Sequence, residues 1–240
     1  MKKKTIVILI TIFILLGIIT LFLINNNRYK NSDSIRFKNE YESLNNTIRA
    51  SDGKTYNYVE IDYKNPIKYI SVEESLSILE SKKAIIYIGA NWCPWCRNML
   101  KAMFDVAKDL KIDTIYYLTL DDDKSNYEIK DGKLIKISDG SDAYYKLLDK
   151  LKEYLKDFEL TEGKKTYPTG EKRIYMPFFI TVKNGSIIEA KEISRELEQG
   201  QNKYSETTEK QYQNLYSDFY DTFRKVYISN NVCNHEDTCN

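Results

Sequence analysis

Histidine is almost absent from this sequence, with one residue in a chain of 240. A single histidine excludes metal sites built from several imidazoles and argues against catalysis by a histidine-based triad. A charge excess is also missing, because 36 Lys and Arg face 35 Asp and Glu. Nucleic-acid binding needs a basic excess or a basic face, so we expect no nucleic-acid partner. With 42% hydrophobic residues, the chain still has the composition of a folded protein.

One long uncharged stretch, residues 5–24, follows three N-terminal lysines. A helix of about 20 residues spans roughly 30 Å, the thickness of the hydrocarbon core of a bilayer. A cleaved signal peptide would end in a small-residue motif, which does not follow here, and the absence of a cysteine argues against a lipoprotein anchor. We therefore favour an uncleaved single-pass anchor in the cell membrane over a cleaved signal. The lysines place the N-terminus in the cytoplasm and the rest of the chain outside, where disulfides persist.

Composition and periodicity divide the remaining chain into three parts. Residues 25–54 are polar and predict a tether with at most a short helix near 35–44, residues 55–228 predict one domain, and residues 229–240 form a tail with two cysteines. Within the domain the pattern predicts strands at 58–63, 84–89 and 114–120, helices at 71–81, 94–110, 144–158 and 212–226, and a hairpin at 178–190. Polar loops are expected at 121–140 and 161–170.

The chemistry-bearing motif is Trp-Cys-Pro-Trp-Cys at residues 92–96. Cys93 precedes Pro94, and proline is favoured as the first residue of a helix. The Cys93 sulfur should therefore face unpaired backbone N–H groups and the positive end of the helix dipole, which lower its pKa. Cys96 lies three residues later, within disulfide reach but beneath the surface. We expect Cys93 to be the exposed nucleophile and Cys96 to be the resolving thiol.

Two other interpretations of the cysteine pair stay open. It could be a structural disulfide, or half of a zinc site completed by Cys233, His235 and Cys239. The strand before the motif, the helix after it and a late proline favour redox chemistry. We therefore expect no bound metal and no cofactor.

The order of elements, the 92–96 motif and the Met176-Pro177 dipeptide resemble the thioredoxin superfamily over roughly residues 56–227. The segment Ile-Gly-Ala-Asn-Trp-Cys-Pro-Trp-Cys at 88–96 resembles, more narrowly, the thioredoxin-like proteins known as bacteriocin transport accessory proteins. The Lys-Asn-Gly turn at 183–185 and the C-terminal cysteine pair add to this likeness. The resemblance implies an α/β fold in which helices flank a central mixed sheet.

The resemblance also assigns roles around the cysteines. It implies that Pro177 is cis and packs against the active-site disulfide, and that Met176 offers backbone groups to an incoming peptide; an ordinary strand-initiating proline is the alternative. Trp92 and Trp95 flank the nucleophile, and we expect Trp95 to contact clients and Trp92 to have a mixed role.

Two departures from the thioredoxin pattern stand out. Tyr87 occupies the position of a buried acid that assists the resolving thiol. The span from Cys96 to Pro177 is also roughly double that of a minimal thioredoxin, so we expect an insertion at about 121–170, with one amphipathic helix. This insertion could shape a client groove or form a lid of added packing, and we favour the lid.

Two functions follow from these features. The first is an extracytoplasmic, membrane-anchored thiol–disulfide oxidoreductase that acts on thiol- or disulfide-containing exported proteins or peptides and uses a redox partner protein. The second is a thioredoxin-fold binding module for peptide export, in which the cysteine pair is a passive staple. The sequence does not give the direction of electron flow.

The tail cysteines generate a prediction of their own. Free thiols in an exported tail oxidise readily, so we expect Cys233 and Cys239 to pair with each other. So small a loop restricts the unfolded chain by only about 2 kcal/mol. The pair could relay electrons to Cys93 and Cys96, or only tie back the tail, which we favour. In the double variant Cys233→Ser, Cys239→Ser we expect unchanged turnover and unchanged reoxidation of Cys93–Cys96; slower reoxidation in a folded protein would establish the relay.

Overall fold

The computed structural model describes residues 13–14, 16–17 and 32–227. The anchor expected at residues 1–24 lies almost wholly outside this range, as does the tail with Cys233 and Cys239. Among the helices of the described residues, none combines the length and the apolar character that crossing a membrane requires.

A five-stranded mixed sheet forms the centre of the domain, in the order β1-β3-β2-β8-β9. β1, β2 and β3 run parallel, and β8 and β9 run antiparallel to their neighbours. The bounds are β1 Ile67–Tyr69, β2 Lys83–Ile88, β3 Ile115–Leu118, β8 Phe178–Lys183 and β9 Ser186–Glu192. β2 is buried from Ala84 to Ile88 because helices cover both faces, as its unbroken apolar run predicts. The expected hairpin is confirmed, and Asn184 and Gly185 at its turn both have positive φ.

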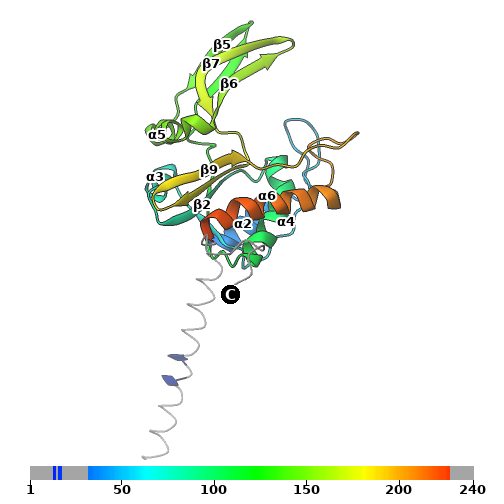
Figure 1. The fold of residues 1–240 in the computed structure, drawn as a ribbon. Helices are drawn as coiled ribbons and strands as arrows, with labels where there is room; N and C mark the ends of the chain where they lie inside the picture. The colour runs from blue at the N-terminus through cyan, green and yellow to red at the C-terminus, as the bar shows by residue number, and fades with distance from the viewer. Residues whose placement is uncertain (1–12, 15, 18–31, 228–240) are drawn as a thin grey trace, which may run out of the picture.

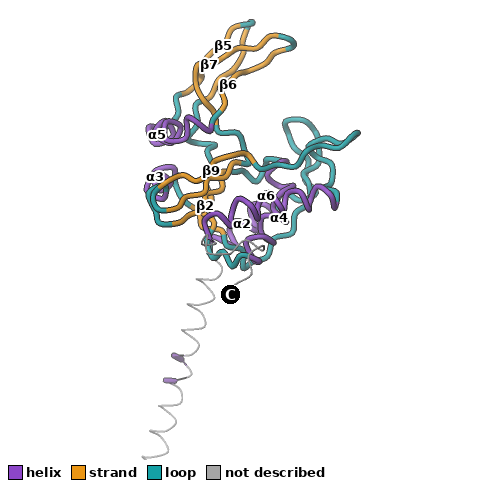
Figure 2. The backbone as a smooth tube through the Cα atoms, viewed as in Figure 1, coloured by secondary structure: helices purple, strands orange, loops and turns teal. Residues whose placement is uncertain are grey.

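Helices cover the two faces of this sheet (Figures 1 and 2). α2 (Asp33–Glu42), α4 (Pro94–Asp109) and α6 (Glu209–Tyr227) contribute to one apolar cluster, and α3 (Val72–Ile78) and α5 (Asp142–Leu151) contribute to the other. The capping box expected at α3 is present, since the Glu74 backbone N–H donates to Ser71 Oγ at 3.1 Å and the Glu74 carboxylate accepts from the Ser71 N–H at 2.8 Å. The structure is thus mixed α/β, with a central sheet between helical layers.

The interpretation of residues 25–54 as a tether is wrong for the part that the structure describes. Phe37 and Tyr41 on α2 are completely buried, and their rings stack with centroids 4.3 Å apart. Both residues belong to the same apolar cluster as α4 and α6. The sequence hides this packing because only one face of a largely charged helix carries the two aromatic rings, four residues apart.

The prediction of a strand at residues 58–63 is also wrong, although the residues of this segment do alternate between buried and exposed positions. Val59 and Ile61 are buried, but their backbone N–H groups donate to side chains, to Asn45 Oδ1 at 3.0 Å and to Glu42 Oε1 at 2.8 Å. Side chains of the N-terminal segment thus accept the hydrogen bonds that a neighbouring strand would otherwise accept. The first strand of the sheet comes later, at Ile67–Tyr69.

The 121–170 region holds more structure than expected. The predicted helix is present but ends at Leu151, followed by a short 3-10 turn, and the loops on either side form two hairpins. These are β4 (Asn126–Lys130) with β5 (Lys133–Ser138), and β6 (Lys156–Glu162) with β7 (Lys165–Arg173). They project from the domain as an arm, green to yellow in Figure 1. Their strands are largely polar and exposed, with only a few alternating apolar residues, although the Asp131-Gly132 turn is a hairpin signal.

The burial of α2 predicts that the N-terminal segment stabilises the domain. Phe37→Ala should lower the free energy of unfolding by about 3–5 kcal/mol, because it removes a ring from a filled core. Urea denaturation followed by circular dichroism measures the change. Ile48→Ala is the matched control, since this side chain comes from the same segment but is 72% exposed. A tether would give equal, small changes for both variants.

Candidate active site

The two cysteines lie where β2 leads into α4. Cys93 has extended backbone angles and is the N-cap of α4, and Pro94 is the first residue of that helix. The Cys93 sulfur accepts a hydrogen bond from the Cys96 backbone N–H at 3.3 Å. The two side chains lie 2.9 Å apart, and both cysteines are free thiols. The arrangement expected of a dithiol at a helix start is therefore present.

The two thiols differ in their readiness to ionise. The pKa of Cys93 is lowered, first by the hydrogen bond with the Cys96 side chain and then, against the effect of burial, by backbone N–H groups and the Arg49 charge. Burial raises the pKa of Cys96 well above its ordinary value. Of the two sulfurs, Cys93 therefore becomes the thiolate at the lower pH, as a nucleophile requires.

Cys93 is much less exposed than the sequence predicts. Only 4% of its surface is accessible, against none for Cys96. The cause is the segment before β8, since the Cys93 sulfur lies 3.8 Å from the Met176 carbonyl oxygen, to which it donates. A client sulfur must therefore approach Cys93 past this segment.

Met176 and Pro177 are brought to the cysteines although they lie about 80 residues away in the chain. The Met176-Pro177 peptide bond is cis, as the resemblance implies. The Met176 side chain is partly buried against both apolar clusters, and this packing holds the segment before β8 in place.

The two tryptophans differ in environment. Trp92 is 37% exposed, and its indole N–H donates to Asp121 Oδ2 at 2.6 Å. Lys124 lies over its ring, 5.7 Å from the centroid, and pairs with the same aspartate. Trp95 is half-buried against the apolar cluster of α4. The client contact expected of Trp95 stays a prediction, and Trp92 is the more exposed of the two side chains.

Arg49 is a site residue that the sequence patterns do not reveal. It donates to the Trp92 carbonyl oxygen and is held by Asp52 at 3.2 Å. Its guanidinium also lies over the rings of Tyr56 and Tyr204, at 5.1 and 5.4 Å. No motif marks it, because it reaches the cysteines only through the docking of residues 33–54.

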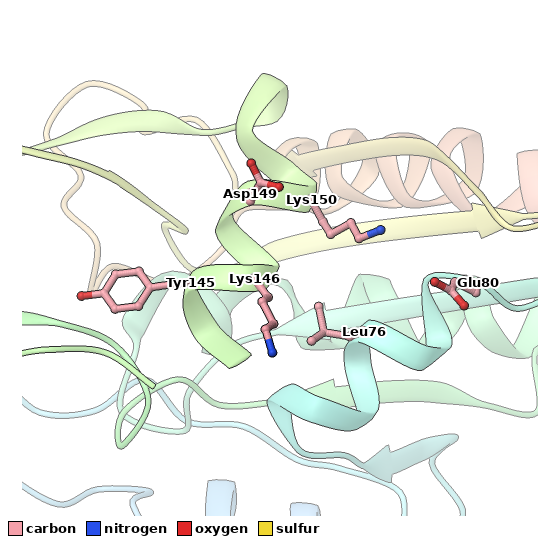
Figure 3. A pocket seen from close by; sticks show the side chains of 6 residues that line it. All are labelled: Leu76, Glu80, Tyr145, Lys146, Asp149 and Lys150. Atoms are coloured by element: carbon pink, nitrogen blue, oxygen red, sulfur yellow. The ribbon is translucent and has the colours of Figure 1, made fainter. Parts of the chain in front are cut away.

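A surface pocket lies in another part of the domain, between α3 and α5 (Figure 3). It is lined by Leu76, Glu80, Tyr145, Lys146, Asp149 and Lys150. Its walls come from the helices of the second apolar cluster, whereas the cysteines belong to the first. Among the described residues, no group of His, Cys, Asp and Glu side chains could hold a metal ion.

No family model matches this chain, and no curated protein matches it significantly.

The difference in pKa predicts selective reactivity. In the reduced protein, iodoacetamide should label Cys93 before Cys96 and at lower pH, because the thiolate is the reacting form. Arg49→Gln should move the Cys93 pH midpoint upward, since it removes a cation that stabilises the thiolate. Lys54→Gln, which removes an exposed charge from the same segment, is the control. Mass mapping across a pH series measures both effects, and faster labelling of Cys96 would reverse the two roles.

Proposed function

We propose that this chain is a thiol–disulfide oxidoreductase with a thioredoxin-like fold, anchored in the cell membrane and acting outside the cytoplasm on exported proteins or peptides. The observation that carries the proposal is the unequal cysteine pair: Cys93 at a helix start with a lowered pKa, and Cys96 buried 2.9 Å away. The sheet order, with a hairpin and a last helix after the cis-proline, supports the fold assignment. The narrower likeness to bacteriocin transport accessory proteins belongs to the same proposal.

The geometry supports an exchange in two steps. The Cys93 thiolate attacks a client disulfide, so that a Cys93–client bond forms and one client sulfur leaves as thiolate. Cys96 then attacks the Cys93 sulfur, closes the Cys93–Cys96 disulfide and releases the second client sulfur. Two electrons pass from the protein to the client. The same steps run in reverse when the oxidised pair meets a client dithiol, and a redox partner protein resets the pair.

One observation favours the second candidate function, a binding module with a passive cysteine pair. Cys93 is only 4% exposed, which is low for a group that must meet a client. In this case the Met176 segment would cover a structural disulfide.

The reduction potential of Cys93–Cys96 separates these two functions. Equilibration with glutathione buffers should give a value between about −270 and −120 mV for an oxidoreductase, whereas a structural disulfide lies below about −300 mV. Cys96→Ala should in addition trap clients as mixed disulfides in cells, because the second step is blocked. The control Cys93→Ala, Cys96→Ala should trap none. A potential below the oxidoreductase range, with no trapped client, would favour the binding module.

A further inference from the structure

Three buried tyrosines lie in the same part of the core as the resolving thiol, Cys96. Tyr41 comes from α2, Tyr87 from β2 and Tyr117 from β3, and all three belong to the apolar cluster that contains Cys96. Tyr41, Tyr87 and Cys96 have no accessible surface. Polar hydroxyl groups in such a position need hydrogen-bond partners, so their arrangement is informative.

The Tyr87 side chain is directed along its strand toward the cysteine motif. Position 89, two residues on and just past the end of β2, is a glycine, and a Cβ atom there would collide with the Tyr87 ring and hydroxyl. Phe179 of β8 stacks on the same ring, with centroids 4.9 Å apart. The phenol is therefore confined between Gly89 and Phe179, and its hydroxyl lies beside Gly89 in the apolar cluster that also contains Cys96.

A second hydroxyl completes the contact. Tyr41 Oη lies 3.0 Å from Tyr87 Oη, and both groups are buried. When Tyr41 donates to Tyr87, the Tyr87 proton is free to point at the Cys96 sulfur. Tyr117 has a different partner, since its hydroxyl donates to the Gly89 carbonyl at 3.2 Å.

We propose that Tyr87, held by Tyr41, is the positioning residue for the second exchange step: its hydroxyl donates to the Cys96 sulfur as that sulfur becomes the attacking thiolate. This inference rests on the proposed oxidoreductase function. Burial raises the pKa of both phenols well above 10, so they keep their protons and act as donors, not as bases. Tyr87 hydrogen bonding lowers the pKa of Cys96 against the larger, opposing effect of burial.

The step balances without another reactant. Cys96 loses its proton, which ends on the released client sulfur, and both tyrosines keep theirs. The Cys96 sulfur then bonds to the Cys93 sulfur while the Cys93–client bond breaks, and the electron pair leaves with the client. Tyr87 contributes one hydrogen bond that is stronger to the thiolate than to the thiol.

Other charged and titratable groups also face this site. Cys93 caps α4 and Arg97 comes from that helix, with its guanidinium 5.9 Å from the centroid of the Tyr41 ring. Tyr117 comes from β3. Any pH profile of the second step includes their effects, so the comparison has to be made between variants that differ by one hydroxyl.

The experiment uses the full chain in detergent, with Cys233→Ser and Cys239→Ser to remove the tail thiols. Reduced protein is mixed with the aromatic disulfide dithionitrobenzoate, which releases one coloured thiolate when Cys93 attacks and a second when Cys96 resolves the mixed disulfide. In Tyr87→Phe we expect an unchanged first phase and a second phase slower by roughly tenfold to hundredfold, the effect of a hydrogen bond to a charged group. The pH midpoint of the second phase should move upward, because less Cys96 thiolate is present at a given pH.

Tyr117→Phe is the matched control, since it removes a hydroxyl from the same cluster that serves the Gly89 carbonyl; its second phase should stay close to that of the parent protein. Tyr41→Phe should slow the second phase less than Tyr87→Phe, and it replaces that variant as the test if Tyr87→Phe does not fold. An unchanged second phase and midpoint in the variant tested, or equal slowing in Tyr117→Phe, would overturn the inference. A parent protein without any second phase would instead overturn the proposed function, and the inference with it.

Discussion

The cap at the start of α4 is the interaction on which the candidate site depends. The Cys93 sulfur takes the place of a capping oxygen and accepts the Cys96 backbone N–H at 3.3 Å. The same contact helps to stabilise the helix end and sets Cys96 almost one turn further in. It adds to the hydrogen bond with the Cys96 side chain in lowering the pKa of Cys93, while burial raises the pKa of Cys96. The unequal character of the two thiols therefore depends both on where the helix begins and on how deeply Cys96 is buried. Pro94, which suits the first helical position, secures that start.

The N-terminal segment is built into this site. Arg97 on α4 is 2% exposed and donates to the Tyr41 carbonyl at 2.8 Å, the Asn57 carbonyl at 2.8 Å and Asn45 Oδ1 at 2.6 Å. A buried guanidinium has to be fully bonded, so these contacts hold α2 and the chain after it against the active-site helix. Arg49 reaches Trp92 from the same segment. The part of the chain nearest the expected anchor thus shapes the cysteine environment.

The insertion has two separate physical roles. α5 is part of the second helical layer, where Leu147 and Leu151 are fully buried, and this agrees with the idea of added packing. The two hairpins instead project as an arm (Figure 2). Where the insertion begins, Asp121 bonds the Trp92 indole and so fixes the most exposed aromatic side chain beside the nucleophile.

By itself, the sequence determined the parts of the molecule that depend on local order. The run of apolar residues in β2, the Ser71–Glu74 capping box, the Asn184-Gly185 turn and the cysteine at a helix start each act within a few residues, and each is found as expected. Tertiary structure alone decided the packing of Phe37 and Tyr41, the position of Arg49, the burial of Cys93 and the clustering of three tyrosines with Cys96. These features join residues that are distant in the chain. A polar helix with two aromatic residues, or a tyrosine in an apolar strand, carries no local mark of the partner that it meets, because that partner is chosen by how the layers pack.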